Sequence, residues 1–229
     1  MTTSNAQFPA LVMIIRHGEK PGDPSNDSDG GPDLSILGSA RAAALPSLFT
    51  PDPTQPAGTL PQLTCALAGA AESEFTGEYG DSKINAGASR YPTPSFLFAT
   101  APTNSSSRPV ETITPTMSAL QFLNNDPNLT INKSYTNDNS GIQGLTTEIL
   151  QNPNTYAGKV ILIAWHHGTI PQLTEAFGVP ASQLPFSKWP STVFDLVFGI
   201  TFPSGQATLG VTCQQLLYGD SSTIPGQSD

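Results

Sequence analysis

The chain has 229 residues, enough to bury one substantial α/β core, and no linker of distinct composition divides it, so we expect a single domain over 1–229. Its formal net charge of -9 argues against nucleic acid as a partner. It has no polybasic run that would hold it on an acidic membrane surface. With only 9 Lys and Arg residues, a site for an anion must concentrate its cations locally.

The first ten residues lack the basic start and long apolar stretch of a signal peptide, and the apolar run that follows is too short to span a bilayer. We therefore expect a cytoplasmic protein, with secretion after processing left open. The two cysteines, Cys65 and Cys213, have no metal-ligand spacing. Free thiols are the simpler expectation for them, and one disulfide between them is the alternative.

Apolar periodicity and turn residues predict alternating strands and helices along the chain. We expect strands near 10–16, 95–100, 129–135 and 159–165, and helices near 35–48, 109–124, 141–151 and 169–177. Strand-like runs follow at 193–202 and 207–218, joined as a hairpin at Pro203-Ser204-Gly205. This order predicts an α/β fold, a three-layer α/β/α sandwich with a mostly parallel central sheet, helices on both faces and a C-terminal edge hairpin.

Two short histidine motifs each come directly after an apolar strand. Residues 11–15 lead into Arg16-His17-Gly18-Glu19-Lys20, and residues 160–165 lead into His166-His167-Gly168. Together the motifs contain all 3 histidines of the chain. Because open α/β sheets bind ligands at the carboxyl ends of their strands, we expect both motifs to face one crevice.

These residue types suit the transfer of a phosphoryl group. Displacing an alcohol from a phosphomonoester requires an in-line nucleophile and cations around the non-bridging oxygens. His17 is the expected nucleophile, because a phosphohistidine divides one difficult displacement into two easier ones. Arg16 and Arg108 can each grip phosphate oxygens with a planar fork. His167 would donate a hydrogen bond to the transferring group, and Gly18 would keep side chains away from the approaching phosphate.

Four segments follow one another along the chain: Arg16-His17-Gly18, residues 33–42 (Asp-Leu-Ser-Ile-Leu-Gly-Ser-Ala-Arg-Ala), residues 105–112 (Ser-Ser-Ser-Arg-Pro-Val-Glu-Thr) and His167-Gly168. Together they resemble the histidine phosphatase superfamily, which has the phosphoglycerate-mutase-like fold. The start Arg-His-Gly-Glu-Lys-Pro resembles that of a small branch of uncertain substrate. The resemblance implies a metal-independent phosphatase that needs no cofactor.

The second histidine motif leaves a question of register. The family pattern ends its strand with one small or polar residue before His-Gly, which assigns the second catalytic role to His167. Alternation along a strand would send neighbouring imidazoles to opposite sides, so we expect only His167 to reach the phosphate. His166 is left as a supporting partner, a proton donor or a residue facing solvent.

The group that protonates the leaving alcohol has no clear signature. Family members of the acid-phosphatase type carry an Asp directly after the second His, whereas Gly168 follows it here. Glu19 and His166 are the candidates for proton donor. Glu111 lies three residues beyond Arg108 on the same expected helix, close enough to be its ion-pair partner. Asp195 either orients an imidazole or ends a strand at the surface.

Residues 50–94 form the main irregular region, with prolines at its start and glycines after them. The resemblance implies an insertion here that covers the active site and selects the substrate. The acidic loop from Pro21 to Pro32 lacks the calcium-binding spacing of an EF-hand, which favours a solvated loop.

The sequence therefore predicts a metal-independent phosphomonoester hydrolase that forms a phosphohistidine and acts on a small phosphorylated molecule. It predicts no nucleic-acid or membrane partner and leaves the oligomeric state open. One alternative is a phosphomutase of the phosphoglycerate mutase type, which needs the same pocket. Another is a catalytically silent phosphate-binding or scaffold protein, because no proton donor is identified.

Overall fold

The structure is a computed structural model that describes residues 7–22, 31–50, 66–67, 91–214, 216–217, 219–221 and 223–224. These residues form a six-stranded sheet and a pair of two-residue strands, β2 (Ala66–Leu67) and β8 (Thr223–Ile224). Most of the irregular region expected over 50–94 lies outside the described residues, and so does the expectation that it covers the site.

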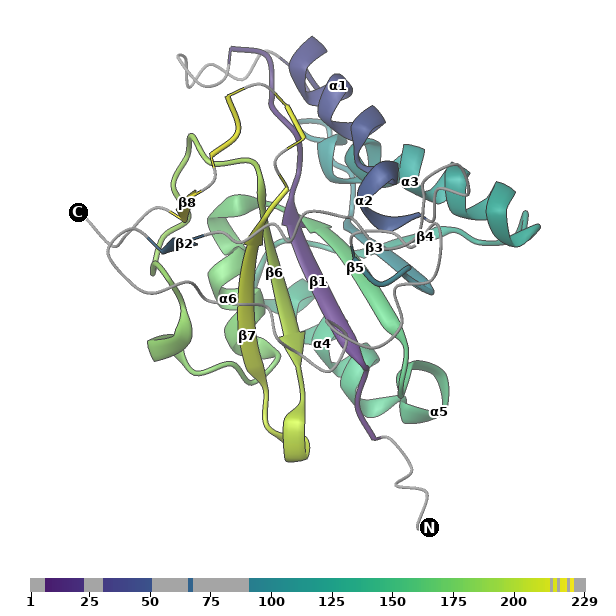
Figure 1. Cartoon of the computed structure of the whole chain (residues 1–229), viewed down its shortest axis with the longest axis vertical. Helices are drawn as coiled ribbons and strands as arrows, with labels where there is room; N and C mark the ends of the chain where they lie inside the picture. Colours follow the sequence, from purple (N-terminus) through teal and green to yellow (C-terminus); the bar gives the residue numbers. More distant parts are fainter. Residues whose placement is uncertain are drawn as a thin grey trace.

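The six-stranded sheet has the strand order β4-β3-β5-β1-β6-β7 (Figure 1). Its strands are β1 (Leu11–Arg16), β3 (Phe96–Thr100), β4 (Ile131–Tyr135), β5 (Val160–Trp165), β6 (Leu196–Thr201) and β7 (Thr208–Cys213). The pairs among β4, β3, β5 and β1 are parallel, whereas β6 runs antiparallel to both β1 and β7. The mostly parallel sheet and the C-terminal edge hairpin are confirmed.

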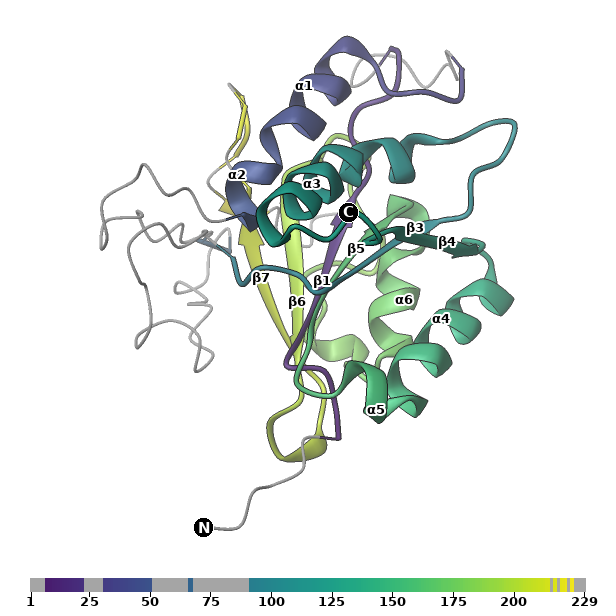
Figure 2. The same cartoon turned by 90° about the vertical axis from the view of Figure 1, so that its right-hand side faces the viewer.

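The helices lie in two layers, one on each side of the sheet (Figure 2). They are α1 (Ile36–Ala44), α2 (Pro46–Phe49), α3 (Arg108–Asn124), α4 (Asn139–Gln151), α5 (Pro153–Tyr156) and α6 (Ile170–Ala176). The apolar residues of α2 and α3 pack in one core, and those of α4 and α6 pack in the other. The expected three-layer sandwich is therefore confirmed.

Strand β1 is buried on both faces because it lies inside the sheet between β5 and β6. Leu11, Met13 and Ile15 face the core shared with α2 and α3, whereas Val12 and Ile14 face the core shared with α4 and α6. Each such fully buried side chain contributes about 1.5–3 kcal/mol relative to an exposed one. The continuous apolar run of this strand is thus what a two-sided sheet requires.

Several expected boundaries shift for local reasons. The helix expected over 35–48 divides at Leu45, because Pro46 has no N–H and begins α2 instead. The helix expected at 169–177 is preceded by a 3₁₀ turn, η1 (His167–Thr169). The strand expected over 207–218 is β7, which ends at Cys213.

Cys213 is fully buried and disulfide-bonded, so the expectation of a free thiol is wrong for it. The other cysteine of the sequence, Cys65, lies outside the described residues. Among the described residues, none of the helices combines the length and the apolar character needed to cross a bilayer.

The start of α4 is fixed by a cap and by one close backbone contact. The Asp138 side chain accepts a hydrogen bond of 2.9 Å from the Gly141 N–H, which explains why the helix begins ahead of the expected residue 141. Gly141 lies against the backbone of Thr136, so closely that a Cβ would overlap the Thr136 nitrogen and oxygen. At this position glycine is required for packing.

The substitution Gly141→Ala should destabilise the fold by about 1–3 kcal/mol, because a methyl group must displace backbone atoms that cannot rotate away. Gly144→Ala, in the same helix, meets only the edge of the Tyr135 ring, 3.2 Å away, and gains up to about 1 kcal/mol of helix propensity. Urea unfolding of both variants measures the difference. Equal stability of the two would contradict the packing requirement.

Candidate active site

His17 is buried, with 3% of its surface exposed, at the point where β1 ends. Its Nδ1 lies 2.7 Å from the carbonyl oxygen of Gly18. A carbonyl can only accept a hydrogen bond, so this contact assigns the imidazole proton to Nδ1 in the neutral ring. Nε2 then holds the free lone pair, which is the form that a nucleophile or general base needs.

The imidazoles of His166 and His167 both lie beside His17. The ring centroid of His166 is 5.2 Å and that of His167 is 6.2 Å from the His17 ring. The register brings them there, because Arg16 and Trp165, the last residues of parallel strands β1 and β5, are paired. The motifs therefore meet at one sheet edge, as the sequence predicts.

The expectation that His166 and His167 point to opposite sides is wrong. Strand alternation applies only while the chain remains extended, and β5 ends at Trp165. His167 begins the 3₁₀ turn η1, which is closed by a hydrogen bond of 3.0 Å from the Thr169 N–H to the His166 carbonyl. The turn brings the second imidazole back toward His17, so both histidines belong to the cluster.

Arg16 is buried and rigidly held. One of its terminal nitrogens donates to the carbonyl oxygens of Ser191 at 2.6 Å and Val193 at 2.8 Å. Its guanidinium carbon lies 3.5 Å from the centre of the Phe194 ring. These contacts fix the plane of the fork and add a cation–π attraction.

Arg108 comes to the same cluster from the start of α3. It is 6% exposed, and its Nη1 donates a hydrogen bond of 2.6 Å to the Gly31 carbonyl. The charges of Arg16 and Arg108 both act on His17 and His166, so the two cations lie within electrostatic reach of these imidazoles. Of the side chains that the sequence singled out, the structure thus brings together His17, His166, His167, Arg16 and Arg108, whereas Glu19 pairs with Arg41.

Burial and neighbouring cations keep the imidazoles neutral. Burial lowers the pKa of His17 well below its ordinary value, and His166, Arg16 and Arg108 lower it further. For His166, burial followed by the charges of Arg108 and Arg16 lowers the pKa to about 4. Near pH 7 both rings are therefore uncharged before any anion binds.

Gly18 makes close contacts that the sequence did not predict. Its N–H donates a hydrogen bond of 2.9 Å to the Thr112 hydroxyl, and a Cβ here would come within 3.1 Å of Gly38 and the Leu34 side chain. The missing side chain therefore makes room for the packing of α1 against the loop. The expected role of Gly18, keeping side chains away from an approaching phosphate, stays a prediction.

The carboxylate of Glu19 is held by Arg41 of α1. Arg41 Nε lies 3.0 Å from Oε1 and 3.1 Å from Oε2 of Glu19, and its Nη2 lies 2.7 Å from Oε1. Both side chains are 4% exposed. Both oxygens of this carboxylate are engaged as acceptors by Arg41, which argues against Glu19 as the proton donor.

Arg41 also binds Asp220, near the C-terminus. Its two terminal nitrogens lie 2.9 and 2.8 Å from the Asp220 carboxylate oxygens, a bidentate pair. Asp220 in turn accepts hydrogen bonds from the N–H groups of Leu216 and Leu217. Burial opposes the charge of Asp220, but the Arg41 and backbone hydrogen bonds outweigh it and hold the pKa below its usual value.

Asp195 is buried beside this pair, so of its two alternatives the exposed strand end is wrong. Its Oδ2 accepts a hydrogen bond of 3.0 Å from the Ser221 N–H. Burial and the negative charge of Asp220 raise the pKa of Asp195. Asp195 and Asp220 thus differ in proton affinity: the pKa of Asp195 is raised and that of Asp220 is lowered.

Sequence reasoning did not identify Arg41, Asp220 and Thr112 as part of the site. Arg41 and Thr112 lie within the family-like segments, and that position is the only signal that marks them. Asp220 is 179 residues from Arg41 along the chain, a separation that no local motif reveals. Glu111 accepts hydrogen bonds from the Leu34 N–H and the Ser107 hydroxyl, which tie the start of α3 to the segment before α1.

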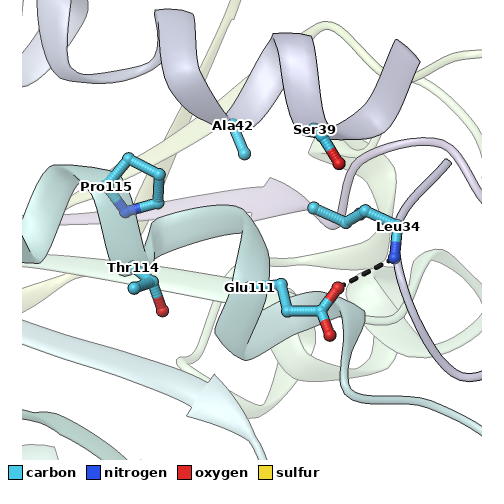
Figure 3. Close-up of a pocket in the computed structure, with 6 residues that line it drawn as sticks. All are labelled: Leu34, Ser39, Ala42, Glu111, Thr114 and Pro115. Carbon is cyan, nitrogen blue, oxygen red and sulfur yellow. Dashed lines mark hydrogen bonds between the residues drawn. The ribbon is translucent and has the colours of Figure 1, made fainter. Parts of the chain in front are cut away.

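A separate cavity of about 360 Å³ lies between α1 and α3 (Figure 3). It is lined by Leu34, Ser39, Ala42, Glu111, Thr114 and Pro115, with no histidine or arginine among them. Figure 3 shows the Glu111 carboxylate turned toward the Leu34 N–H at its edge. The cavity is therefore distinct from the histidine cluster. Within the described ranges, no group of three His, Cys, Asp or Glu side chains is arranged to hold a metal ion.

No family model and no curated protein matches the chain. Among solved structures it is similar to phosphoglycerate mutase from Bacillus anthracis str. Sterne, at 11% identity over 92% of this chain and 96% of that one, with a TM-score of 0.49. The protein histidine phosphatase SixA is similar at 15% identity, 89% and 97% coverage and a TM-score of 0.44. Phosphoserine phosphatase from Entamoeba histolytica is similar at 10% identity, 90% and 98% coverage and 0.42. All three likenesses are of low identity with TM-scores below 0.5, so the chemistry of the site rests on this chain's own residues.

Asp195→Asn should raise the unfolding midpoint near pH 7. The raised pKa means that the folded protein binds this proton more tightly than the unfolded chain, so Asp195 costs stability as pH rises through its folded pKa. Asparagine keeps an acceptor for the Ser221 N–H without the charge. The gain over wild type should shrink as pH falls toward the ordinary Asp pKa of about 3.9.

Asp220→Asn is the matched control and should have the opposite sign. Because the pKa of Asp220 is lowered by folding, its charge stabilises the protein near neutral pH, and that contribution is lost as pH falls through its folded pKa. Thermal unfolding of both variants between pH 3.5 and 7.5 provides the comparison. Shifts of the same sign at neutral pH would refute the assigned charges.

Proposed function

We propose that the chain is a phosphomonoester hydrolase that works without a metal and forms a phosphohistidine at Nε2 of His17. One observation carries the proposal: the Nδ1 contact with the Gly18 carbonyl leaves the Nε2 lone pair available in a ring that lies beside two imidazoles and within electrostatic reach of two guanidiniums. A phosphomonoester needs a nucleophile together with several donors around its oxygens.

The arginines supply the charge that the substrate requires. In a protein of net charge -9, Arg16 and Arg108 form a local positive site that can attract and orient a dianion. Each planar fork can donate to two phosphate oxygens at once. His167 adds a further donor beside the transferring group, so that negative charge in the transition state is met by fixed groups.

The reaction then proceeds in two balanced steps. The His17 Nε2 lone pair attacks phosphorus, the bond from phosphorus to the leaving oxygen breaks, and that oxygen takes a proton from His166. Water next attacks phosphorus and gives a proton to His166 as the phosphorus–nitrogen bond breaks. Inorganic phosphate leaves, and His17 returns to its neutral form.

We assign the proton donor to His166 because Glu19 is engaged by Arg41. Burial, followed by the charges of Arg108 and Arg16, holds the pKa of His166 at about 4. A bound phosphate dianion opposes the effect of those charges, so binding itself raises the proton affinity of this ring. His166 would therefore be protonated in the substrate complex, and turnover would be favoured at acid pH.

The first test is release of phosphate from 4-nitrophenyl phosphate in excess chelator, for wild type and His17→Ala. We expect the wild type to turn over and the variant to lose at least about a thousandfold in kcat/KM, because the nucleophile is gone. Lys133→Ala, at an exposed position on β4, is the control and should match wild type. Acid quenching should destroy the phosphoenzyme, whereas alkali should preserve it. Phosphate binding by a wild type that releases no product would instead support the silent phosphate-binding protein.

Arg108→Gln should raise the pKa of His166 from about 4 toward the ordinary histidine value near 6.5, and it should raise the pKa of His17 as well. The reason is the loss of a positive charge beside both rings. NMR titration of the 3 histidines measures this directly and needs no turnover. Inorganic phosphate should bind about tenfold or more weakly, since one charged donor is lost. Unchanged titration curves would show that Arg108 does not face the cluster.

A further inference from the structure

The carbonyl that fixes His17 belongs to the peptide unit between Gly18 and Glu19. A peptide unit is planar, so its carbonyl oxygen cannot turn unless the whole plane turns. The 2.7 Å contact between this oxygen and His17 Nδ1 sets both the tautomer and the direction of the ring. Whatever holds the plane therefore also holds the reactive nitrogen.

The first anchor of this plane is on α3. The Gly18 N–H donates a hydrogen bond of 2.9 Å to the Thr112 hydroxyl. That hydroxyl donates in turn to the Arg108 carbonyl at 2.7 Å, one helical turn earlier. On the N-terminal side of the Gly18–Glu19 peptide plane, the chain is thus tied to α3, the helix that carries Arg108.

The second anchor lies on the C-terminal side of the peptide plane, where Glu19 contacts α1 and its N-cap residue Ser35. The Glu19 carbonyl accepts a hydrogen bond of 2.9 Å from the Ser35 N–H, and the Glu19 side chain accepts three hydrogen bonds from Arg41. Gly38 allows this approach, because a Cβ there would overlap the Glu19 backbone. Both sides of the peptide plane are therefore held by helices.

Arg41 is itself held in place by its second carboxylate. Asp220 occupies the other edge of the guanidinium, and its side chain is only 6% exposed. Burying these charges gives little net stability compared with apolar residues of similar volume. A guanidinium between two carboxylates does, however, fix direction, because its donors lie in one rigid plane.

We propose that Glu19 and Arg41 are positioning residues for His17: Arg41, anchored on Asp220, holds Glu19 and with it the Gly18 carbonyl that orients the nucleophile. The inference rests on the proposed function only in taking His17 as the nucleophile. It gives Glu19 a role that differs from proton donation, and the two roles have different consequences for the leaving group.

The experiment compares Glu19→Gln and Arg41→Lys with wild type, and uses Glu175→Gln, at an exposed position on α6, as the matched control. The nitrogen shifts of the His17 ring in ¹⁵N-labelled protein report whether Nδ1 carries the proton. The kcat/KM values for 4-nitrophenyl phosphate and glycerol 2-phosphate report phosphorylation with a good and a poor leaving group. We expect both variants to lose the clean Nδ1–H signature and to lose tenfold or more in kcat/KM by the same factor for both substrates. The control should change neither.

Two results would overturn the proposal. A loss in Glu19→Gln confined to glycerol 2-phosphate, with the His17 signature unchanged, would make Glu19 the proton donor. Unchanged nitrogen shifts of the His17 ring together with unchanged kcat/KM values would show that Glu19, Arg41 and Asp220 serve only the stability of the fold. If Arg41→Lys does not fold, Asp220→Asn replaces it, because it weakens only the outer anchor and should give a smaller change of the same kind. The ring signature needs no turnover, so failure of the proposed function and failure of this inference are read separately.

Discussion

The hydrogen bond from His17 Nδ1 to the Gly18 carbonyl is the contact on which the site depends, because it decides which ring nitrogen is free to react. Strand pairing brings the three imidazoles to one edge, but strand pairing alone does not select a tautomer. The tautomer is selected by the Gly18 carbonyl oxygen, which cannot turn unless its whole peptide plane turns. Two helices on the same face of the sheet, α1 and α3, contact the loop that carries this oxygen.

Electrostatics add a second constraint. The chain has twice as many acidic as basic residues, 18 against 9, yet Arg16 and Arg108 both act on the buried histidines. Without an anion this arrangement keeps the rings neutral, and with an anion the same charges are compensated. Burial is the larger cause of the lowered pKa of His166, and an anion bound here would oppose only the part that Arg108 and Arg16 add.

Much of this could be predicted from local sequence. The apolar runs before the two histidine motifs predicted β1 and β5, and parallel strands that end together necessarily bring their following residues close. The shared position of both imidazoles could not be predicted, because it depends on a 3₁₀ turn that begins at His167. The link from Arg41 to Asp220 had no local signal, since its partners are far apart in the sequence and meet only through tertiary packing. One unbroken helix was expected over 35–48, although Pro46, which lacks an N–H, is a local signal for the break at Leu45.

The carboxylates around Arg41 explain how the loop can remain fixed at the acid pH where the proposed donor gains its proton. Near pH 4, where His166 titrates, Asp195 already holds a proton more readily than an ordinary Asp, and Asp220 holds one less readily. Acid therefore removes the charge that repels Asp220 before it removes the charge that binds Arg41. The proposed proton transfer from His166 is thus compatible with a charged Asp220 on Arg41.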